Sequence, residues 1–517
     1  MGLAMTRGVV MALTAVHEGL AGALEELRQV LGAEFVHTEY YQRALRTTSA
    51  TPFGLHQWGD FLPDVVVRPG STSEVQQIVR IANQWRVPIV PRGAGAGLAD
   101  GAMPLKRGIV VDIKRMHEVL EIDEENHTVT VQPGINMMEL NKILRPLNLW
   151  FPDDPASYPV NVLGGRVGTG GWSLIGGGYG HIPDNVVSME VVTPTGNIIR
   201  VGEGGARKVR KSSTGYRLKD LFIGHQGTLG ITTELTLDLA PRPEMELPVF
   251  FAMRSWEDAH RLTLALGKSG LRTLCGVFQF DERKVDFLRR DDEAWIPLPK
   301  WVQAATGAIC YGTAAEVEAA KATIFEIGAA NGGTYLGQEM SEGDWASRHD
   351  RYHLAYHGRS EGQIRLMAWS IDDCAVPWSS LPIVKRRWYE LADALVAKHP
   401  EHFDVWGMFM YTNNPFRPWG DHLTELDMGI NELEMTDEIW ADWIEFKTEV
   451  ARVAVQHGGS VSACHGGTRE GEVNVSTYEE LAEGQFELMK QIKRLLDPNN
   501  IMNPGKYNLD EAYGGEA

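Results

Sequence analysis

Glycine is concentrated in three segments of this chain, and these segments constrain the fold more than any other feature. Residues 91–97 read PRGAGAG and follow the apolar run VPIV. Residues 163–181 contain nine glycines, and residues 215–243 turn at glycines before they continue as a regular strand pattern. Ordering so much glycine costs entropy, but a backbone without Cβ atoms lets a ligand approach closely. The three segments therefore predict one long ligand threaded between sheet layers.

The first glycine segment fits neither of two common phosphate-binding loops. The dinucleotide fingerprint GxGxxG needs a third glycine where Leu98 or Asp100 stands, and it needs a helix directly afterwards. The Walker pattern needs Gly-Lys-Ser/Thr, which this segment lacks. Successive backbone N–H groups can still form a nest for an anion. A tight loop without a ligand is the alternative interpretation.

Bulk composition excludes several classes of function. The chain has 517 residues, enough for two or three domains, and a net charge of -19. This negative charge argues against binding to nucleic acid and against membrane binding through polybasic contacts. The four cysteines are far apart and form no CxxC pair, so neither a structural zinc site nor a disulfide framework is expected. A cytoplasmic protein without a membrane span is the expectation.

The N-terminus allows two targeting interpretations. Arg7 precedes a short apolar run, which has a weak signal-peptide shape, and Gly2 with Thr6 fits the myristoylation pattern. The simpler interpretation is the frayed start of a helix, because residues 17–33 carry apolar side chains at helical spacing.

The first half of the chain predicts a mixed α+β unit. Residues 65–67 read as a strand, and Ser71 with Glu74 predicts a capping box at the start of a helix. Hairpins are predicted at 119–132 and 190–201, and a further strand at 230–239.

The second half repeats a strand–helix–strand order from about residue 246. Residues 247–253, 273–280 and 307–312 read as strands, with helical patterns after the first and the third of them. This order predicts a ferredoxin-like domain at 246–455. A helix is predicted near 477–496, and the sequence shows no internal repeat.

Several strings together resemble one enzyme family. PRGAGAG, FPDDPAS, GGRVGTGGWSLIGGGYG, EVVTPTG and GTLGIT follow one another in the first half, and IDDCAVPWSSLP, GGSVSACHGG and IKRLLDPNNIMNPGK follow in the second. They resemble PCMH-type FAD-linked oxidases of the vanillyl-alcohol oxidase superfamily. The most similar branch holds D-lactate dehydrogenase, the glycolate oxidase flavin subunit and alkyl-dihydroxyacetone-phosphate synthase. The resemblance extends over nearly the whole chain.

This resemblance implies a domain layout. We expect an α+β fold with an N-terminal helical segment at 1–59 and a two-lobed PCMH-type FAD-binding domain at 60–245. A ferredoxin-like cap follows at 246–455. The C-terminal segment, 456–517, is expected to return to the FAD-binding domain.

The resemblance also implies which residues contact FAD. Residues 91–97 would take the pyrophosphate, residues 152–180 would flank the flavin, and Ile231 would contact the adenine end. Non-covalent FAD is expected, because Ala94 and Ala96 stand where many relatives carry a tethering His. A tether from His422 in the cap is the alternative. The expected cofactor-binding residues are Pro91, Arg92, Gly93, Ala94, Gly95, Ala96, Gly97, Pro152, Ser157, Gly164, Gly165, Gly168, Thr169, Gly171, Gly177, Tyr179, Gly180, Gly230, Ile231 and Asn503.

The sequence departs from the metal-dependent members of this branch. Their His-rich GDGNLH element is replaced here by WGMFMYTNNPFRPWGDH, and their Glu-His-Gly by Cys464, His465 and Gly466. Metal-ligand positions are therefore missing, and no metal site is predicted.

Three residues are candidates for catalysis. His465 can accept a hydroxyl proton while hydride leaves for flavin N5, because the ordinary pKa of imidazole lies near neutral pH. Arg348, just after Trp345, resembles a cap arginine that grips a substrate carboxylate. Tyr411 lies on a predicted strand where the family lines its pocket, with Phe409 on the same face. The plainer interpretations are a turn-capping His, a surface ion pair and a core Tyr.

The expected function is FAD-dependent oxidation of a CH–OH group in a small hydroxy acid, aromatic alcohol or aliphatic alcohol. The electron acceptor would be O₂, a quinone or a protein, and a homodimer is expected. The alternatives are a non-redox flavoenzyme like alkyl-dihydroxyacetone-phosphate synthase, a phenol oxidase like vanillyl-alcohol oxidase, and a subunit that keeps FAD without catalysis. The apolar strand around Tyr411 predicts a substrate larger and less polar than lactate.

Overall fold

The computed structural model describes residues 17–47, 59–202, 208–290, 298–349, 368–412, 421–431, 435–466 and 480–514. Residues 1–16, on which both targeting interpretations depend, lie outside these ranges. Within the described ranges, no helix is long and apolar enough to cross a membrane.

The first sheet is small and mainly parallel. Helix α4 (Thr72–Trp85) links β2 to β3 as a crossover, and its residues Val75, Ile78 and Val79 are fully buried. Ser71 caps α4 through the Glu74 N–H, whereas the Glu74 carboxylate accepts from the Gly70 N–H, so the predicted box is only half present. The strands, in spatial order, are β1 (Val36–His37), β2 (Val65–Val67), β4 (Ile109–Asp112) and β3 (Ile89–Arg92).

The N-terminal segment differs from the expected purely helical one. Helices α2 (Leu20–Leu31) and α3 (Tyr40–Ala44) are present, but β1 between them pairs antiparallel with β2. The segment therefore contributes an edge strand to the first sheet, and two residues are too few for a periodic pattern to reveal it.

The second sheet is antiparallel and contains the predicted hairpins. Strand β10 lies at its centre because it pairs with both β6 and β8. The nine-glycine segment lies beside it and forms the short helices α6 (Leu163–Thr169) and α7 (Gly176–Tyr179), and α8 (Ile182–Asn185) follows directly. The strands, in spatial order, are β5 (Val119–Asp123), β6 (Thr128–Val131), β10 (Ile231–Asp238), β8 (Val186–Val192) and β9 (Ile198–Gly202).

The cap is built on one antiparallel sheet of seven strands. The chain contains two βαββα units, β12–α9–β13–β14–α11 and then β16–α14–β17–β18–α15. The first has an additional helix, α10 (Glu282–Arg290), between β13 and β14, and β15 with α12 (Gln338–Ala346) lies between the units. They join side by side through β13 and β17, which extends the expected ferredoxin-like arrangement to a duplicated one without a repeat in the sequence. The strands, in spatial order, are β15 (Thr334–Tyr335), β12 (Met245–Met253), β14 (Ala304–Gly312), β13 (Leu274–Phe280), β17 (Phe403–Thr412), β18 (Asp421–Ile430) and β16 (Ala368–Pro377).

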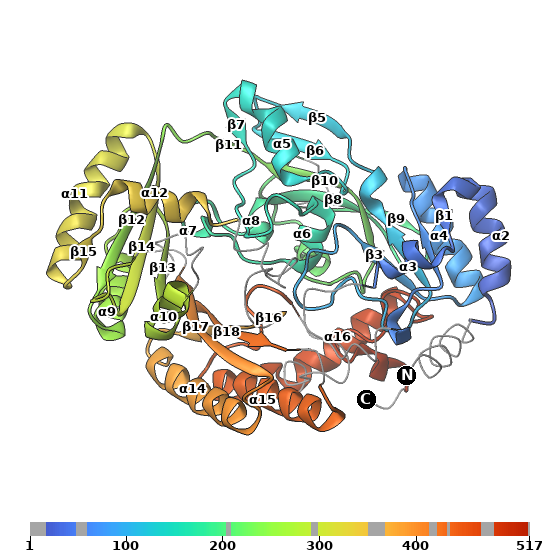
Figure 1. Cartoon of the computed structure of the whole chain (residues 1–517). Helices are drawn as coiled ribbons and strands as arrows, with labels where there is room; N and C mark the ends of the chain where they lie inside the picture. The colour runs from blue at the N-terminus through green and yellow to red at the C-terminus, as the bar shows by residue number, and fades with distance from the viewer. Residues whose placement is uncertain are drawn as a thin grey trace.

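Alternation along the cap strands separates two environments. Val277, Met408 and Met410 face the core formed with the cap helices, whereas the intervening side chains of Phe278 and Tyr411 belong to a second cluster on the opposite face. The four long helices cover the first face, as Figure 1 shows. They are α9 (Trp256–Gly267), α11 (Ala314–Ala330), α14 (Leu381–Lys398) and α15 (Asp437–Gln456).

The C-terminal segment packs against the first sheet. After α16 (Glu483–Leu496), the Ile89 N–H donates to the Ile501 carbonyl at 2.6 Å, and the Asn503 N–H donates to the Ile89 carbonyl at 2.7 Å. Residues 501–503 thus lie beside the strand that leads into the first glycine loop. The boundaries at 60, 246 and 456 stay predictions.

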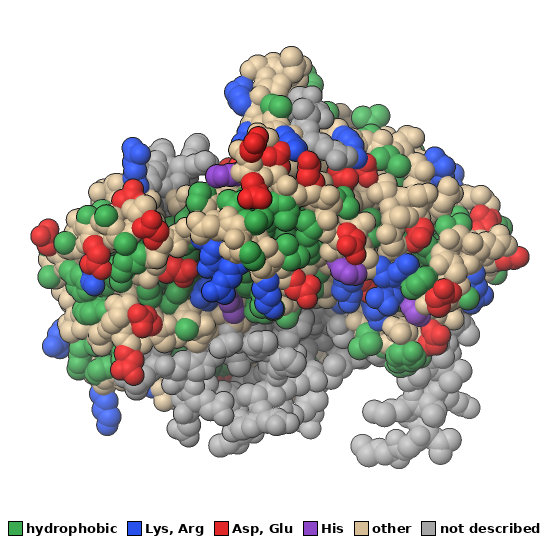
Figure 2. Space-filling model, turned by 90° about the horizontal axis from the view of Figure 1, so that it is seen from above, with side chains coloured by type: hydrophobic (Ala, Val, Ile, Leu, Met, Phe, Trp, Pro, Cys, Tyr) green, Lys and Arg blue, Asp and Glu red, His purple; other side chains and the backbone are tan. Residues whose placement is uncertain are grey.

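Charges of both signs are mixed over the face in Figure 2, where Lys and Arg side chains alternate with Asp and Glu.

Candidate active site

One continuous cavity runs from the glycine loops to the second face of the cap sheet. It contains the three catalytic candidates, His465, Arg348 and Tyr411, and most of the expected cofactor-binding residues. Of the latter, the lining residues are Pro91, Arg92, Gly93, Ala94, Gly95, Ala96, Gly97, Ser157, Gly164, Gly165, Gly168, Thr169, Gly230 and Ile231. The expected residues outside the lining are Pro152, Gly171, Gly177, Tyr179, Gly180 and Asn503.

Several glycines of this cavity leave free space where a side chain would otherwise lie. A Cβ on Gly97 or Gly168 would meet no protein atom within 4 Å, so protein packing does not require glycine at either position. Gly95 has a φ of 73°, a conformation that favours glycine. Open backbone along a long cavity fits FAD, because close approach to the ligand is what would require these glycines.

Two residues expected to touch the cofactor hold the loops around the cavity through backbone carbonyls. The Asn503 amide donates to the carbonyls of Gly101 (2.9 Å) and Gln226 (2.6 Å) and so joins two loops of the cavity wall. Arg92 is buried, and its Nη1 donates to the carbonyls of Arg46 and Ala102 at 3.3 Å. The C-terminal segment therefore helps to shape the cavity without lining it at Asn503.

His465 is held by a buried carboxylate. Its Nδ1 lies 3.0 Å from Asp373 Oδ1. Asp373 Oδ2 accepts from the backbone N–H groups of Ala463, Cys464 and His465 at 2.6–3.2 Å, which fixes the segment on which the imidazole sits. Burial alone would lower the pKa of His465, but Cys464 and Asp373 raise this pKa well above its ordinary value.

A second carboxyl group lies beside this pair. Glu425 lines the cavity, and in the sheet register it stands between Phe409 on β17 and Asp373 on β16. Burial, with the charge of Asp427, raises the pKa of Glu425 to about 8. Glu425 is therefore a neutral carboxylic acid at neutral pH, able to donate a hydrogen bond.

Lys284 supplies a cation on the same wall. Its Nζ donates to Asp427 Oδ2 at 2.5 Å, and Asp427 is almost fully buried. The ammonium also lies 5.2 Å from the ring centroid of Phe287. The charge of Lys284 is thus compensated within the chain.

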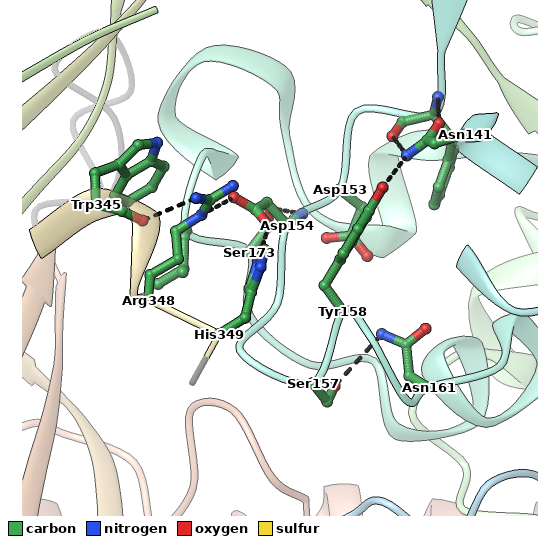
Figure 3. Close-up of polar contacts among 12 residues, drawn as sticks. Asn141, Asp153, Asp154, Ser157, Tyr158, Asn161, Ser173, Trp345, Arg348 and His349 are labelled. Atoms are coloured by element: carbon green, nitrogen blue, oxygen red, sulfur yellow. Dashed lines mark hydrogen bonds and ion pairs between the residues drawn. The ribbon is translucent and has the colours of Figure 1, made fainter. Parts of the chain in front are cut away.

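Arg348 connects the cap to the segment FPDDPAS (151–157) of the FAD-binding domain through Asp154 (Figure 3). Its Nε donates to Asp154 Oδ2 at 2.8 Å, and its Nη1 donates to the Trp345 carbonyl at 2.8 Å. His349 Nε2 lies 2.6 Å from Asp154 Oδ1. Burial opposes ionisation of Asp154, yet Arg348 and His349 lower the pKa of this carboxyl below its ordinary value.

Tyr411 lines the cavity with its ring, while its hydroxyl has a partner. The hydroxyl donates to the Leu174 carbonyl in the nine-glycine segment, and burial raises its pKa well above the ordinary value. The ring stacks on Phe278 with centroids 6.1 Å apart, and Phe409 shares the same face, as predicted. This geometry suits a wall residue that links the cap to the nine-glycine segment.

An aromatic wall completes the cap side of the cavity. It is lined by Phe278, Phe280, Phe287, Trp345, Trp406, Phe409 and Tyr411. Such a wall favours an apolar or aromatic substrate body. No cluster of three or more His, Cys, Asp or Glu side chains in the described ranges could hold a metal ion.

Sequence reasoning missed three carboxyl groups of this site. Asp154 and Asp373 lie inside the strings FPDDPAS and IDDCAVPWSSLP, which were noticed without a role for either residue. Glu425 had no local signal, because its position follows only from the register of β18 between β17 and β16. The side chain of His422, the alternative tether, lies outside the described part of the structure.

The sequence matches two family profiles and is similar to several known proteins. Residues 63–202 match the family profile of the FAD binding domain, and residues 242–507 match that of the FAD linked oxidases, C-terminal domain. Glycolate oxidase subunit GlcD of Bacillus subtilis is 30% identical over 492 residues, covering 94% of this chain and 97% of that protein. The probable mitochondrial D-lactate dehydrogenase of Danio rerio is 30% identical over 457 residues, 86% of this chain and 84% of that protein.

Solved structures share the fold. Substrate-bound p-cresol methylhydroxylase superposes with a TM-score of 0.78 at 18% identity, covering 98% of this chain and 99% of that one. Alkyldihydroxyacetonephosphate synthase gives 0.72 at 21% identity, covering 94% and 84%. The chain belongs to the FAD-linked oxidases and is an FAD-dependent oxidoreductase.

Proposed function

We propose that this enzyme oxidises a CH–OH group of a small organic substrate and that His465 accepts the hydroxyl proton. The observation that supports this most directly is the imidazole itself, which lines the cavity and is held at Nδ1 by Asp373. Two relatives are named for glycolate and D-lactate, which are both 2-hydroxy acids. When bound, FAD supplies the two-electron acceptor.

Several residues have separate roles around the substrate. Asp373 orients His465 and stabilises the imidazolium that forms when the proton arrives. Because the pKa of His465 is raised, the imidazole stays protonated to a higher pH than an ordinary histidine, and its neutral, proton-accepting form becomes populated only as the pH rises further. The aromatic wall excludes water from the reacting carbon, and neutral Glu425 is placed to donate to a substrate oxygen.

The experiment is anaerobic mixing of the holoenzyme with candidate alcohols and hydroxy acids, followed by flavin absorbance. His465→Ala should keep its FAD but reduce flavin about 10²–10⁴-fold more slowly, the usual contribution of a positioned general base. His399→Ala is the matched control, since His399 Nε2 lies 2.6 Å from Asp442 Oδ2 outside the cavity. Near-normal reduction by His465→Ala would exclude the proposed role.

Phenol oxidation is a second candidate, and the aromatic wall is the observation that favours it. A 4-alkylphenol should then bleach the flavin faster than any alcohol in the same assay. A non-redox reaction like that of the synthase would leave the flavin oxidised with every substrate at the end of turnover.

A further inference from the structure

Three cations of the cavity wall are already neutralised by carboxylates of the same chain. Arg166 makes a bidentate pair with Asp153, with N–O distances of 2.7 and 2.9 Å, in addition to the pairing of Lys284 with Asp427 and of Arg348 with Asp154. Arg92, at the first glycine loop, donates to backbone carbonyls. An anionic substrate group would have to compete with a resident carboxylate at each of the three paired cations.

Among these cations, Arg348 is the one that resembles the family's cap arginine, which is expected to bind a substrate carboxylate. A guanidinium binds a carboxylate best through two parallel N–H groups, either Nε with Nη2 or Nη1 with Nη2. Here Asp154 takes the single Nε–H, which removes the first pair, and the Trp345 carbonyl takes one of the two N–H groups of Nη1, which competes with the second pair. The guanidinium also stacks 4.2 Å from the Trp345 ring centroid, which fixes its plane.

Asp154 is held firmly in this position. Its backbone N–H donates to Ser173 Oγ at 3.0 Å, and its carbonyl accepts from the Leu174 N–H at 2.9 Å. His349 Nε2 contacts the second carboxylate oxygen of Asp154. Figure 3 shows that Arg348 and His349 both point toward this carboxylate. Displacing Asp154 would leave a buried carboxylate without its partner, which is costly.

We propose that Asp154 is a specificity-determining residue: by occupying Arg348 it excludes carboxylate substrates and selects an uncharged alcohol or phenol with an aromatic or apolar body. A substrate carboxylate beside Arg348 would also lie beside the ionised Asp154 and would be repelled by it. The wall of Phe278, Phe280 and Phe409 receives the apolar body. The oxidation of the selected substrate rests on the proposed function, whereas the preferential binding of uncharged ligands does not.

The test compares two ligands that share a phenyl ring and differ by a carboxylate: benzyl alcohol and D-mandelate. Oxalate serves as a second, unreactive carboxylate probe. Dissociation constants are measured by calorimetry and by perturbation of the oxidised flavin spectrum, and reduction is measured by anaerobic mixing. The variants are Asp154→Asn, which is nearly isosteric, and the double variant Asp154→Asn/Arg348→Met, which removes both partners.

The wild-type enzyme should bind benzyl alcohol more tightly than D-mandelate. Asp154→Asn should bind oxalate and D-mandelate about tenfold to a hundredfold more tightly than the wild type, the range expected for hydrogen bonds to a released guanidinium. The double variant should lose this gain, which assigns it to Arg348.

Three results would overturn the proposal. They are tighter binding of D-mandelate than of benzyl alcohol by the wild type, no gain of carboxylate binding in Asp154→Asn, and a gain that persists in the double variant. The first result needs no variant and so remains decisive if Asp154→Asn does not fold. If every alcohol, hydroxy acid and 4-alkylphenol of the anaerobic assay leaves the flavin oxidised, while benzyl alcohol still binds more tightly than D-mandelate, the proposed reaction is refuted and the selection of uncharged ligands stands.

Discussion

Asp373→Asn is the substitution that examines the candidate active site most closely. Asp373 Oδ2 accepts three backbone N–H groups at 2.6–3.2 Å, and Oδ1 lies 3.0 Å from His465 Nδ1. Asparagine has a single oxygen, and the three N–H groups require an acceptor. The amide NH₂ must therefore turn toward His465 Nδ1, which then has to accept a hydrogen bond.

This change places the imidazole proton on Nε2, the other ring nitrogen, so the imidazole can no longer accept a proton there. Reduction of the flavin by substrate should fall about 10²–10⁴-fold, as for loss of a general base, although His465 is still present. The substitution also removes the carboxylate that helps to raise the pKa of His465. In the wild type the rate rises with pH as the imidazole deprotonates, and in Asp373→Asn the remaining limb should move to lower pH.

The assay is anaerobic stopped-flow reduction across the pH range, with FAD content and thermal unfolding measured in parallel. Asp442→Asn is the matched control, because Asp442 is the partner of His399 outside the cavity. The control should keep the wild-type rate and pH profile. An Asp373→Asn enzyme with a normal rate and an unshifted profile would refute the role given to this pair.

Four further outcomes are expected. Acid precipitation should release FAD into the supernatant, and flavin that stays with the protein would indicate a covalent tether. Gly168→Ala should weaken binding of FAD to the apoprotein about 10–100-fold in a fluorescence titration, because the added Cβ points into the open cavity. Gly343→Ala is the control, since Gly343 has equal free space but lies in α12 (Gln338–Ala346), outside the cavity, and it should bind FAD as the wild type does. Equal affinities of the two variants would contradict the placement of FAD. Glu425→Gln should abolish a flavin absorbance titration centred near pH 8, since Glu425 loses its proton there, and persistence of that titration would assign it elsewhere. Arg166→Met should lower the free energy of unfolding in urea by about 3–5 kcal/mol, because Asp153 is left buried and unpaired, and a change below about 1 kcal/mol would show that the pair is solvated.

The sequence was sufficient for features that depend on local pattern. Period-two alternation placed Phe409 and Tyr411 on one face, and glycine spacing located the loops of the cavity. It was not sufficient for features that depend on distant contacts. Arg348 was expected to meet a substrate carboxylate, but its partner Asp154 is 194 positions away in the chain.

The same reason explains the missed carboxyl groups around His465. Glu425 and Asp373 become neighbours only through the register of β18 with β16, and Asp373 meets the backbone near His465 across about ninety residues. No periodicity in either segment encodes those pairings. The catalytic assignments of His465, Arg348 and Tyr411 stay predictions until the variants are measured.

The order in which the chain is synthesised has a consequence for cofactor loading. Strand β3 enters the first glycine loop early in the chain, yet its Ile89 is paired by Ile501 and Asn503 near the end. At a synthesis rate of roughly 5–20 residues per second, about 20–80 s separate these two parts on the ribosome. Throughout that interval the nascent loop lacks the segment that supports it. We therefore expect capture of FAD to be completed only after residues 501–503 have been made, and β3 is an open sheet edge until then.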